Sequence, residues 1–164
     1  MKRKPIQISA DSDVGKQRAG NEDSYRVVGP GEVEGLDALF VVADGMGGHA
    51  AGEVASQMAV DSVIDRLTEM APVPTFALST EIEVLPFITS VMKMANSEVV
   101  AEGEASPDKR GMGTTCTLGM IKSHDSFLVI GHIGDSRGYL LRDGVLDRIT
   151  DDHSVVEEEV RKGL

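Results

Sequence analysis

The pair Asp44-Gly45, directly after the apolar run 39–43, is the strongest candidate for chemistry in the sequence. An aspartate at the end of a buried strand is held on a rigid support, and the glycines that follow allow a tight turn with uncovered carbonyls. A carboxylate beside a free carbonyl is a set of hard oxygen ligands for Mg²⁺ or Mn²⁺. The pair therefore indicates a metal site, although an ordinary strand-to-helix turn is equally compatible with these residues alone.

Two further clusters supply charged groups that suit a phosphate and a metal. In the first, Arg18 is a forked donor for phosphate oxygens, and Glu22 and Asp23 are adjacent carboxylates. On an extended segment these two carboxylates would point to opposite faces, so only one could bind a given metal directly. The other would orient a metal-bound water or support the first. In the second cluster, Asp135 is expected at a sheet end, where it could reach a metal or cap a turn.

The segments around these clusters predict the elements that would position them. Short β-branched and apolar runs predict strands, helical spacing predicts helices, and Asp143-Gly144 is a hairpin turn signal. The strands of this pattern follow one another with short turns instead of alternating with helices, which favours an α+β fold with antiparallel sheet. The expected strands are 6–12, 24–28, 36–43, 112–122, 126–133 and 136–142, and the expected helices are 51–70, 84–102 and one that begins at Asp152.

Dinucleotide binding is a competing interpretation, because a Gly-x-Gly-x-x-Ala match begins at Gly45 between a strand and a helix. Two features oppose it. The prolines at 72 and 74 occupy the stretch where a second strand ending in an acid should follow the helix. In addition, Asp44 would place a negative charge beside the pyrophosphate.

Composition narrows the classes of partner. Sixteen basic against 27 acidic residues give a formal charge of −11, which repels nucleic acid and anionic lipid and favours cations. The single cysteine, Cys116, excludes an internal disulfide and fits a reducing cytoplasm. The longest apolar run is far too short to span a membrane. We therefore expect a cytoplasmic protein with one domain over residues 1–164 and with no nucleic-acid or membrane partner.

Taken in order, five motifs resemble those of the metal-dependent 2C-type protein serine/threonine phosphatases, in a form typical of bacteria. They are Arg-x-x-Asn-Glu-Asp, Asp-Gly-Met-Gly-Gly-His, Gly-x-Gly-Thr-Thr, Gly-Asp-Ser-Arg and Thr-Asp-Asp-His-Ser. The resemblance implies a sandwich of two antiparallel β-sheets flanked by helices. It also implies dephosphorylation of phosphoserine and phosphothreonine, placed on proteins by serine/threonine kinases, through metal-activated water.

The same resemblance implies roles for individual residues. Asp44 would bridge two metals, Arg18 would hold the substrate phosphate, and no covalent enzyme intermediate would form. The implied ligands of two Mn²⁺ or Mg²⁺ ions, and of a weaker third ion, are Asp44, Gly45, Asp23, Glu22 and Asp135.

Two departures from the family pattern bear on this reading. Some members carry a histidine, proposed as general acid, where this chain has Met46. The family normally continues beyond the position of Leu164 with strands that carry two more metal-binding aspartates, so we expect a domain that is incomplete at its C-terminal end. The alternative function is therefore a catalytically poor binding or regulatory module. The oligomeric state is not predicted.

Overall fold

The computed structural model describes residues 6–18, 20–33, 36–47, 50–69, 81–122 and 127–153. In chain order its elements are strands β1 (Asp23–Val28) and β2 (Ala38–Met46), helices α1 (Ala50–Glu69) and α2 (Glu81–Ala105), a 3-10 turn at Pro107–Lys109, and strands β3 (Gly113–Thr114), β4 (Cys116–Lys122), β5 (Phe127–Ile133), β6 (Tyr139–Arg142) and β7 (Val145–Arg148).

The strands form two sheets in which every pairing is antiparallel. The larger sheet has the order β1-β2-β4-β5 with β3 beside the end of β2, and β6 pairs only with β7. The predicted α+β class with two antiparallel sheets is confirmed. The dinucleotide interpretation is wrong, because its fold requires parallel strands.

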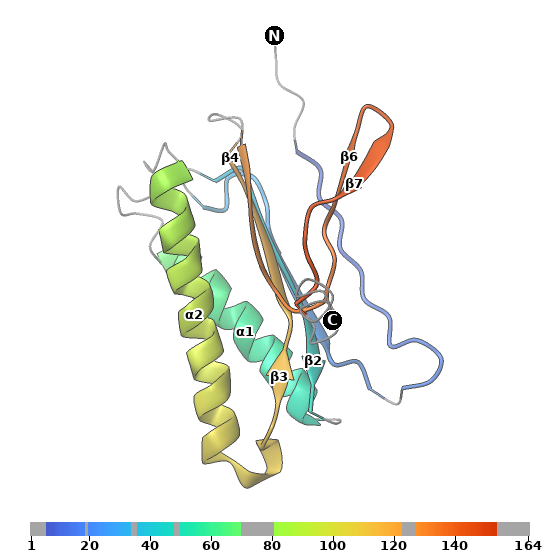
Figure 1. Ribbon diagram of the computed structural model, residues 1–164, viewed down its shortest axis with the longest axis vertical. Coiled ribbons are helices and arrows are strands. Elements are labelled where there is room, and N and C mark those ends of the chain that lie inside the picture. The colour runs from blue at the N-terminus through green and yellow to red at the C-terminus, as the bar shows by residue number, and fades with distance from the viewer. Residues whose placement is uncertain are drawn as a thin grey trace, which may run out of the picture.

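Helices α1 and α2 cover one face of the larger sheet (Figure 1). The core lies between the sheet and the two helices, because alternate residues of β2 and β4 point toward the helices while their neighbours point away. Gly131 on β5 allows a close approach of α2, since a Cβ there would lie 2.6 Å from the sulfur of Met92. The fully buried large side chains of this core include Leu39, Val41, Val60, Val63, Leu67, Val84, Leu118 and Met120.

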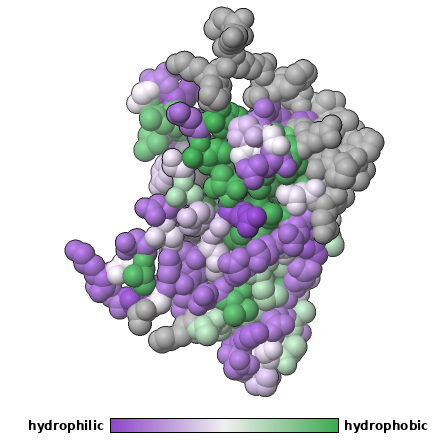
Figure 2. Space-filling model, turned by 180° about the vertical axis from the view of Figure 1, so that it is seen from behind, coloured by the Kyte–Doolittle hydropathy of each residue, from purple (hydrophilic) through white to green (hydrophobic). Residues whose placement is uncertain are grey.

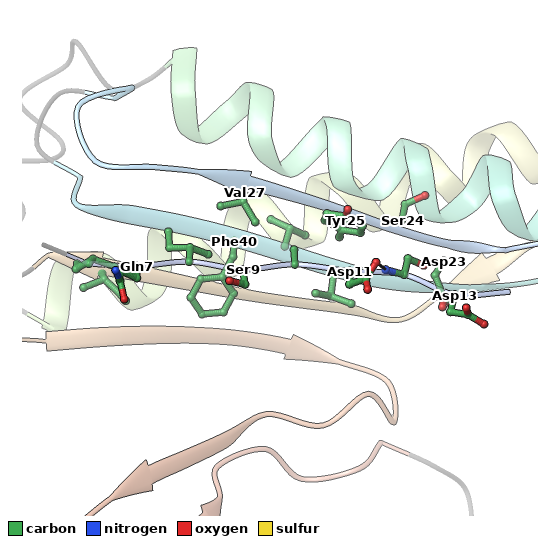
Figure 3. A pocket seen from close by; sticks show the side chains of 16 residues that line it. Gln7, Ser9, Asp11, Asp13, Asp23, Ser24, Tyr25, Val27 and Phe40 are labelled. Atoms are coloured by element: carbon green, nitrogen blue, oxygen red, sulfur yellow. Dashed lines mark hydrogen bonds between the residues drawn. The ribbon is translucent and has the colours of Figure 1, made fainter. Parts of the chain in front are cut away.

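The opposite face of the sheet lies toward the β6–β7 hairpin and toward residues 6–13, the N-terminal segment (Figure 1). Phe40 lies across Gly119 on this face, where an added Cβ would meet the ring at 2.0 Å. Apolar surface gathers in the upper middle of the molecule seen from behind (Figure 2). The N-terminal segment runs along the sheet and, with Tyr25, Val27 and Phe40, lines a cleft of about 620 Å³ (Figure 3). This face is therefore less completely packed than the helix-covered one.

Four predicted strands differ from those observed, and the expected strand 136–142 begins only at Tyr139 as β6. Residues 6–12 are not a strand, and the end of this segment instead forms a local bond from the Ser12 N–H to the Asp11 carboxylate. Strand β2 continues through Met46, so Asp44-Gly45 lies within a strand and not in a turn. The expected strand 112–122 is split at Thr115 into β3 and β4, which pair with different parts of β2.

The helices and the hairpin agree more closely with the predictions. Helix α1 confirms the expected 51–70 within one residue, whereas α2 is longer than 84–102 and holds Pro86 in its interior. The turn at Asp143-Gly144 is confirmed, and both residues have positive φ, 52° and 81°, as a two-residue hairpin loop requires. Asp152 is not helical, and the rest of the expected third helix lies outside the described residues. No described helix has the length and hydropathy that a membrane span would need.

Candidate metal centre

The pairing of β1 with β2 brings two of the predicted ligands together. Asp23 lies directly opposite Asp44 in the antiparallel register. Ser24, the next residue, is buried against α1, and its hydroxyl lies 2.9 Å from that of Ser56. Because side chains alternate along a strand, Asp23 points to the same exposed face as Asp44. Asp23 is thus the member of the acidic pair that lies beside Asp44.

Glu22 occupies the other side of the strand. Its carboxylate lies against helix α1, 2.8 Å from where a Cβ on Gly52 would be, and its side chain is only 16% exposed. Its backbone carbonyl accepts hydrogen bonds from the Gly45 N–H at 3.1 Å and from the Ser56 hydroxyl at 2.6 Å. The predicted division of the pair between two faces is confirmed.

Gly45 is required by the approach of α1. A Cβ at Gly45 would lie 2.0 Å from the carbonyl oxygen of Gly52 and 2.7 Å from that of Glu22, distances at which backbone would have to move. Helix α1 therefore rests directly on the Asp44-Gly45 backbone. This contact fixes the end of β2 on which Asp44 is carried.

Two threonines hold the Asp44 backbone from the other side. The Asp44 N–H donates to the Thr115 hydroxyl at 2.9 Å, and the Thr115 N–H donates to the Asp44 carbonyl at 2.9 Å. The Thr114 hydroxyl donates to the same carbonyl at 3.0 Å. Asp44 is therefore fixed through its backbone while its carboxylate stays on the exposed face.

Three of the charged candidate residues act on the pKa of a fourth, Asp44. The pKa of Asp44 is raised, first by desolvation and then by repulsion from and hydrogen bonding with Asp23, and Asp135 adds to the repulsion. The Arg18 guanidinium opposes this and lowers the same pKa. Arg18 is 66% exposed and lies 3.9 Å from a Glu22 oxygen. Asp23 therefore lies directly opposite Asp44, and the charges of Asp135 and Arg18 also act on the pKa of Asp44.

This donor set suits a divalent cation. A cation would offset the repulsion that Asp44 feels from the neighbouring carboxylates, and all the donors are hard oxygens. Among the residues that the structure describes, no group of three His, Cys, Asp or Glu side chains has converged into a ready-made site. An ion here would take part of its coordination from carbonyl oxygen or water.

Two positions that sequence reasoning treated as ordinary strand and turn residues contribute to the site. Thr115 contacts Asp44, and its hydroxyl also lies 2.8 Å from that of Ser136, the neighbour of Asp135. The signal was present in the Gly-x-Gly-Thr-Thr and Gly-Asp-Ser-Arg motifs, but only the fold shows that they meet. His49, another residue of the glycine-rich motif, lies outside the described residues.

A family model supports what the fold and the carboxylate cluster suggest. The model described as Protein phosphatase 2C matches residues 16–159. The chain belongs to the protein phosphatase 2C family.

Individual relatives are similar over most of this chain. The serine/threonine phosphatase stp of Listeria monocytogenes (serotype 4b, strain F2365) is 41% identical over 152 residues, which is 93% of this chain and 56% of the relative. The crystal structure of the Mycobacterium tuberculosis serine/threonine phosphatase PstP/Ppp has a TM-score of 0.72 at 40% identity, covering 94% of this chain and 58% of that one.

Another structure, the catalytic domain of PstP in complex with two manganese ions, has a TM-score of 0.71 at 40% identity and covers 94% of this chain and 59% of its own. The present chain therefore spans a little over half the length of the Listeria relative and of these two solved chains.

Proposed function

We propose that this protein removes phosphate from phosphoserine and phosphothreonine in other proteins, with divalent cations as cofactor. The family supports this class of reaction. The observation of this chain that carries the proposal is the strand register that sets Asp23 directly opposite Asp44 on one exposed face, where the charges of Arg18 and Asp135 also act on the pKa of Asp44. Carboxylates for cations beside an arginine for phosphate are the parts that phosphomonoester hydrolysis with a metal-bound water needs.

Each residue has a proposed task. Asp44 would be shared by two ions, the Gly45 carbonyl and Asp23 would be further ligands, and Asp135 would hold a weaker third ion. Glu22, which is turned toward α1, supports the site or orients a bound water and does not take the place of Asp23.

In the mechanism we propose, the chain orients the phosphate and balances charge. Bound divalent ions supply a water of lowered pKa and neutralise phosphoryl oxygens. Arg18 is exposed, so its guanidinium can reach a phosphate at the surface and donate paired hydrogen bonds to two of its oxygens. The backbone hydrogen bonds of Asp44 fix the point on β2 from which its carboxylate would reach an ion.

The identity of the metal, the source of the substrates and the compartment are part of the same proposal. The manganese in a relative supports Mn²⁺ as the metal, with Mg²⁺ as the alternative. The substrates are expected to be products of serine/threonine kinases, and the cytoplasm is the expected compartment. The alternative of a catalytically poor binding or regulatory module gains no stronger support from the relatives, which carry phosphatase names.

The proposal is tested with a phosphothreonine peptide, by measuring phosphate release with and without MnCl₂. Release that depends on Mn²⁺ and stops with a chelator supports it. A protein that binds Mn²⁺ in calorimetry but releases no phosphate from any of several phosphopeptides would favour the binding module instead.

A further inference from the structure

Thr115 lies at the junction between β3 and β4 and contacts the strand that carries Asp44. Its hydroxyl accepts the Asp44 N–H at 2.9 Å, and its own N–H donates to the Asp44 carbonyl at 2.9 Å. A threonine hydroxyl has one proton and two lone pairs, so after one lone pair has accepted the Asp44 N–H, the proton and the second lone pair remain for another hydrogen bond. This second hydrogen bond joins the Thr115 and Ser136 hydroxyls at 2.8 Å.

The same side chain supports the turn that carries Asp135. Gly134, with φ +106°, passes so close that a Cβ there would lie 2.6 Å from the Thr115 methyl carbon. Ser136 on the other side of Asp135 forms the hydroxyl bond to Thr115. The Thr115 side chain therefore touches both neighbours of Asp135 and also the backbone of Asp44. Thr115 and Asp44 are 71 residues apart in the sequence.

We propose that Thr115 is a positioning residue that sets the spacing between the Asp44 and Asp135 carboxylates, and through it the affinity of the site for divalent cations. The inference rests on the proposed function of this site. Groups that orient metal ligands without touching the metal govern affinity through such contacts.

The test compares four variants of the protein by titration with MnCl₂ in a calorimeter, together with their thermal midpoints. Thr115→Val keeps the shape but removes both hydroxyl bonds, Thr115→Ser keeps the hydroxyl, and Ser136→Ala removes only the bond to the turn. Thr117→Val is the matched control, because Thr117 lies on β4 two residues after Thr115, and its hydroxyl lies 2.8 Å from His132 Nδ1 instead of contacting Asp44.

We expect Thr115→Val to weaken Mn²⁺ affinity about 10- to 100-fold, as the loss of an orienting group does at other metal sites. Thr115→Ser should stay close to the unaltered protein, and Ser136→Ala should fall between the two. Because one hydroxyl serves both contacts, the double variant Thr115→Val/Ser136→Ala should bind no more weakly than Thr115→Val alone. The control should leave affinity unchanged.

Two results would overturn the inference while leaving the proposed function intact. One is unchanged Mn²⁺ affinity in Thr115→Val, and the other is an equal loss in Thr117→Val. If Thr115→Val fails to fold, Ser136→Ala decides the question, since unaltered Mn²⁺ affinity in that folded variant removes the proposed link. A protein that itself neither binds Mn²⁺ nor shows Mn²⁺-dependent phosphatase activity overturns the inference and the proposed function together.

Discussion

The two faces of strand β2 differ in what they require of their residues. Leu39, Val41 and Ala43 point toward the helices and have no exposed surface, whereas Val42, between them, is 46% exposed. Asp44 lies on the exposed face, one residue before Gly45, which is packed against α1. A single strand thus carries core residues on one face and the candidate ligand Asp44 on the other, and a charge is tolerated one residue away from a tight backbone contact.

Substitution of Asp44 should give the largest effect and the clearest separation of the two faces. Asp44→Asn keeps the size but removes the charge that would balance two cations, so kcat/KM for a phosphopeptide should fall about 1,000-fold, or ~4 kcal/mol. The fold should survive, because the side chain is on the exposed face. Asp65→Asn, an exposed change on α1, is the control and should retain activity. An Asp44→Asn protein that unfolds would show that both faces serve stability.

Cys116 reports on the helix-covered side. Burial raises the pKa of this thiol to about 11, so at pH 8 the folded protein holds it almost entirely protonated. Because the thiolate is the reactive form, alkylation by iodoacetamide at pH 8 should be about 200-fold slower in the folded protein than in urea. The rate should rise about tenfold per pH unit toward 11. Equal rates in the folded and unfolded protein would mean that this face is not closely packed.

Truncation of a core side chain should affect stability alone. Leu118 is fully buried between the sheet and the helices, so Leu118→Ala should lower the free energy of unfolding by about 3 kcal/mol. Urea denaturation measures this, and Val100→Ala on the exposed side of α2, where Val100 is 48% exposed, should change it by less than about 0.5 kcal/mol. A similar loss in both variants would contradict the distinction between core and surface.

Arg18→Lys should give the smallest of these effects, on the exposed face. Lysine keeps the charge but loses the paired donors, so KM for a phosphopeptide should rise and kcat/KM should fall about tenfold, or ~1.4 kcal/mol. Arg26→Lys, on β1, is the control and should leave both KM and kcat/KM unchanged. An unaltered kcat/KM in Arg18→Lys would mean that the ion pair with Glu22 is the whole role of this arginine.

Local patterns were sufficient to predict much of this molecule. Helix α1, the hairpin turn at Asp143-Gly144 and the antiparallel order of the strands follow from periodicity and turn chemistry, which act over a few residues. The alternation of Glu22 and Asp23 is equally local, and it correctly divides the pair between two faces. The five ordered motifs were enough to recognise the family.

Tertiary structure decided how the motifs meet. Strand β2 extends through Asp44 to Met46 because β1 pairs with it on one side and Thr114 and Thr115 bond it on the other. The threonine bonds join residues 70 and 71 positions apart. Pattern reasoning placed a turn there, since glycines are typical of turns and the partner strands are distant in sequence. Strand register likewise places Asp23, and not Glu22, beside Asp44. The end of β5 brings Ser136 to Thr115. Both the register and the end of β5 are set only when the whole sheet packs against its helices.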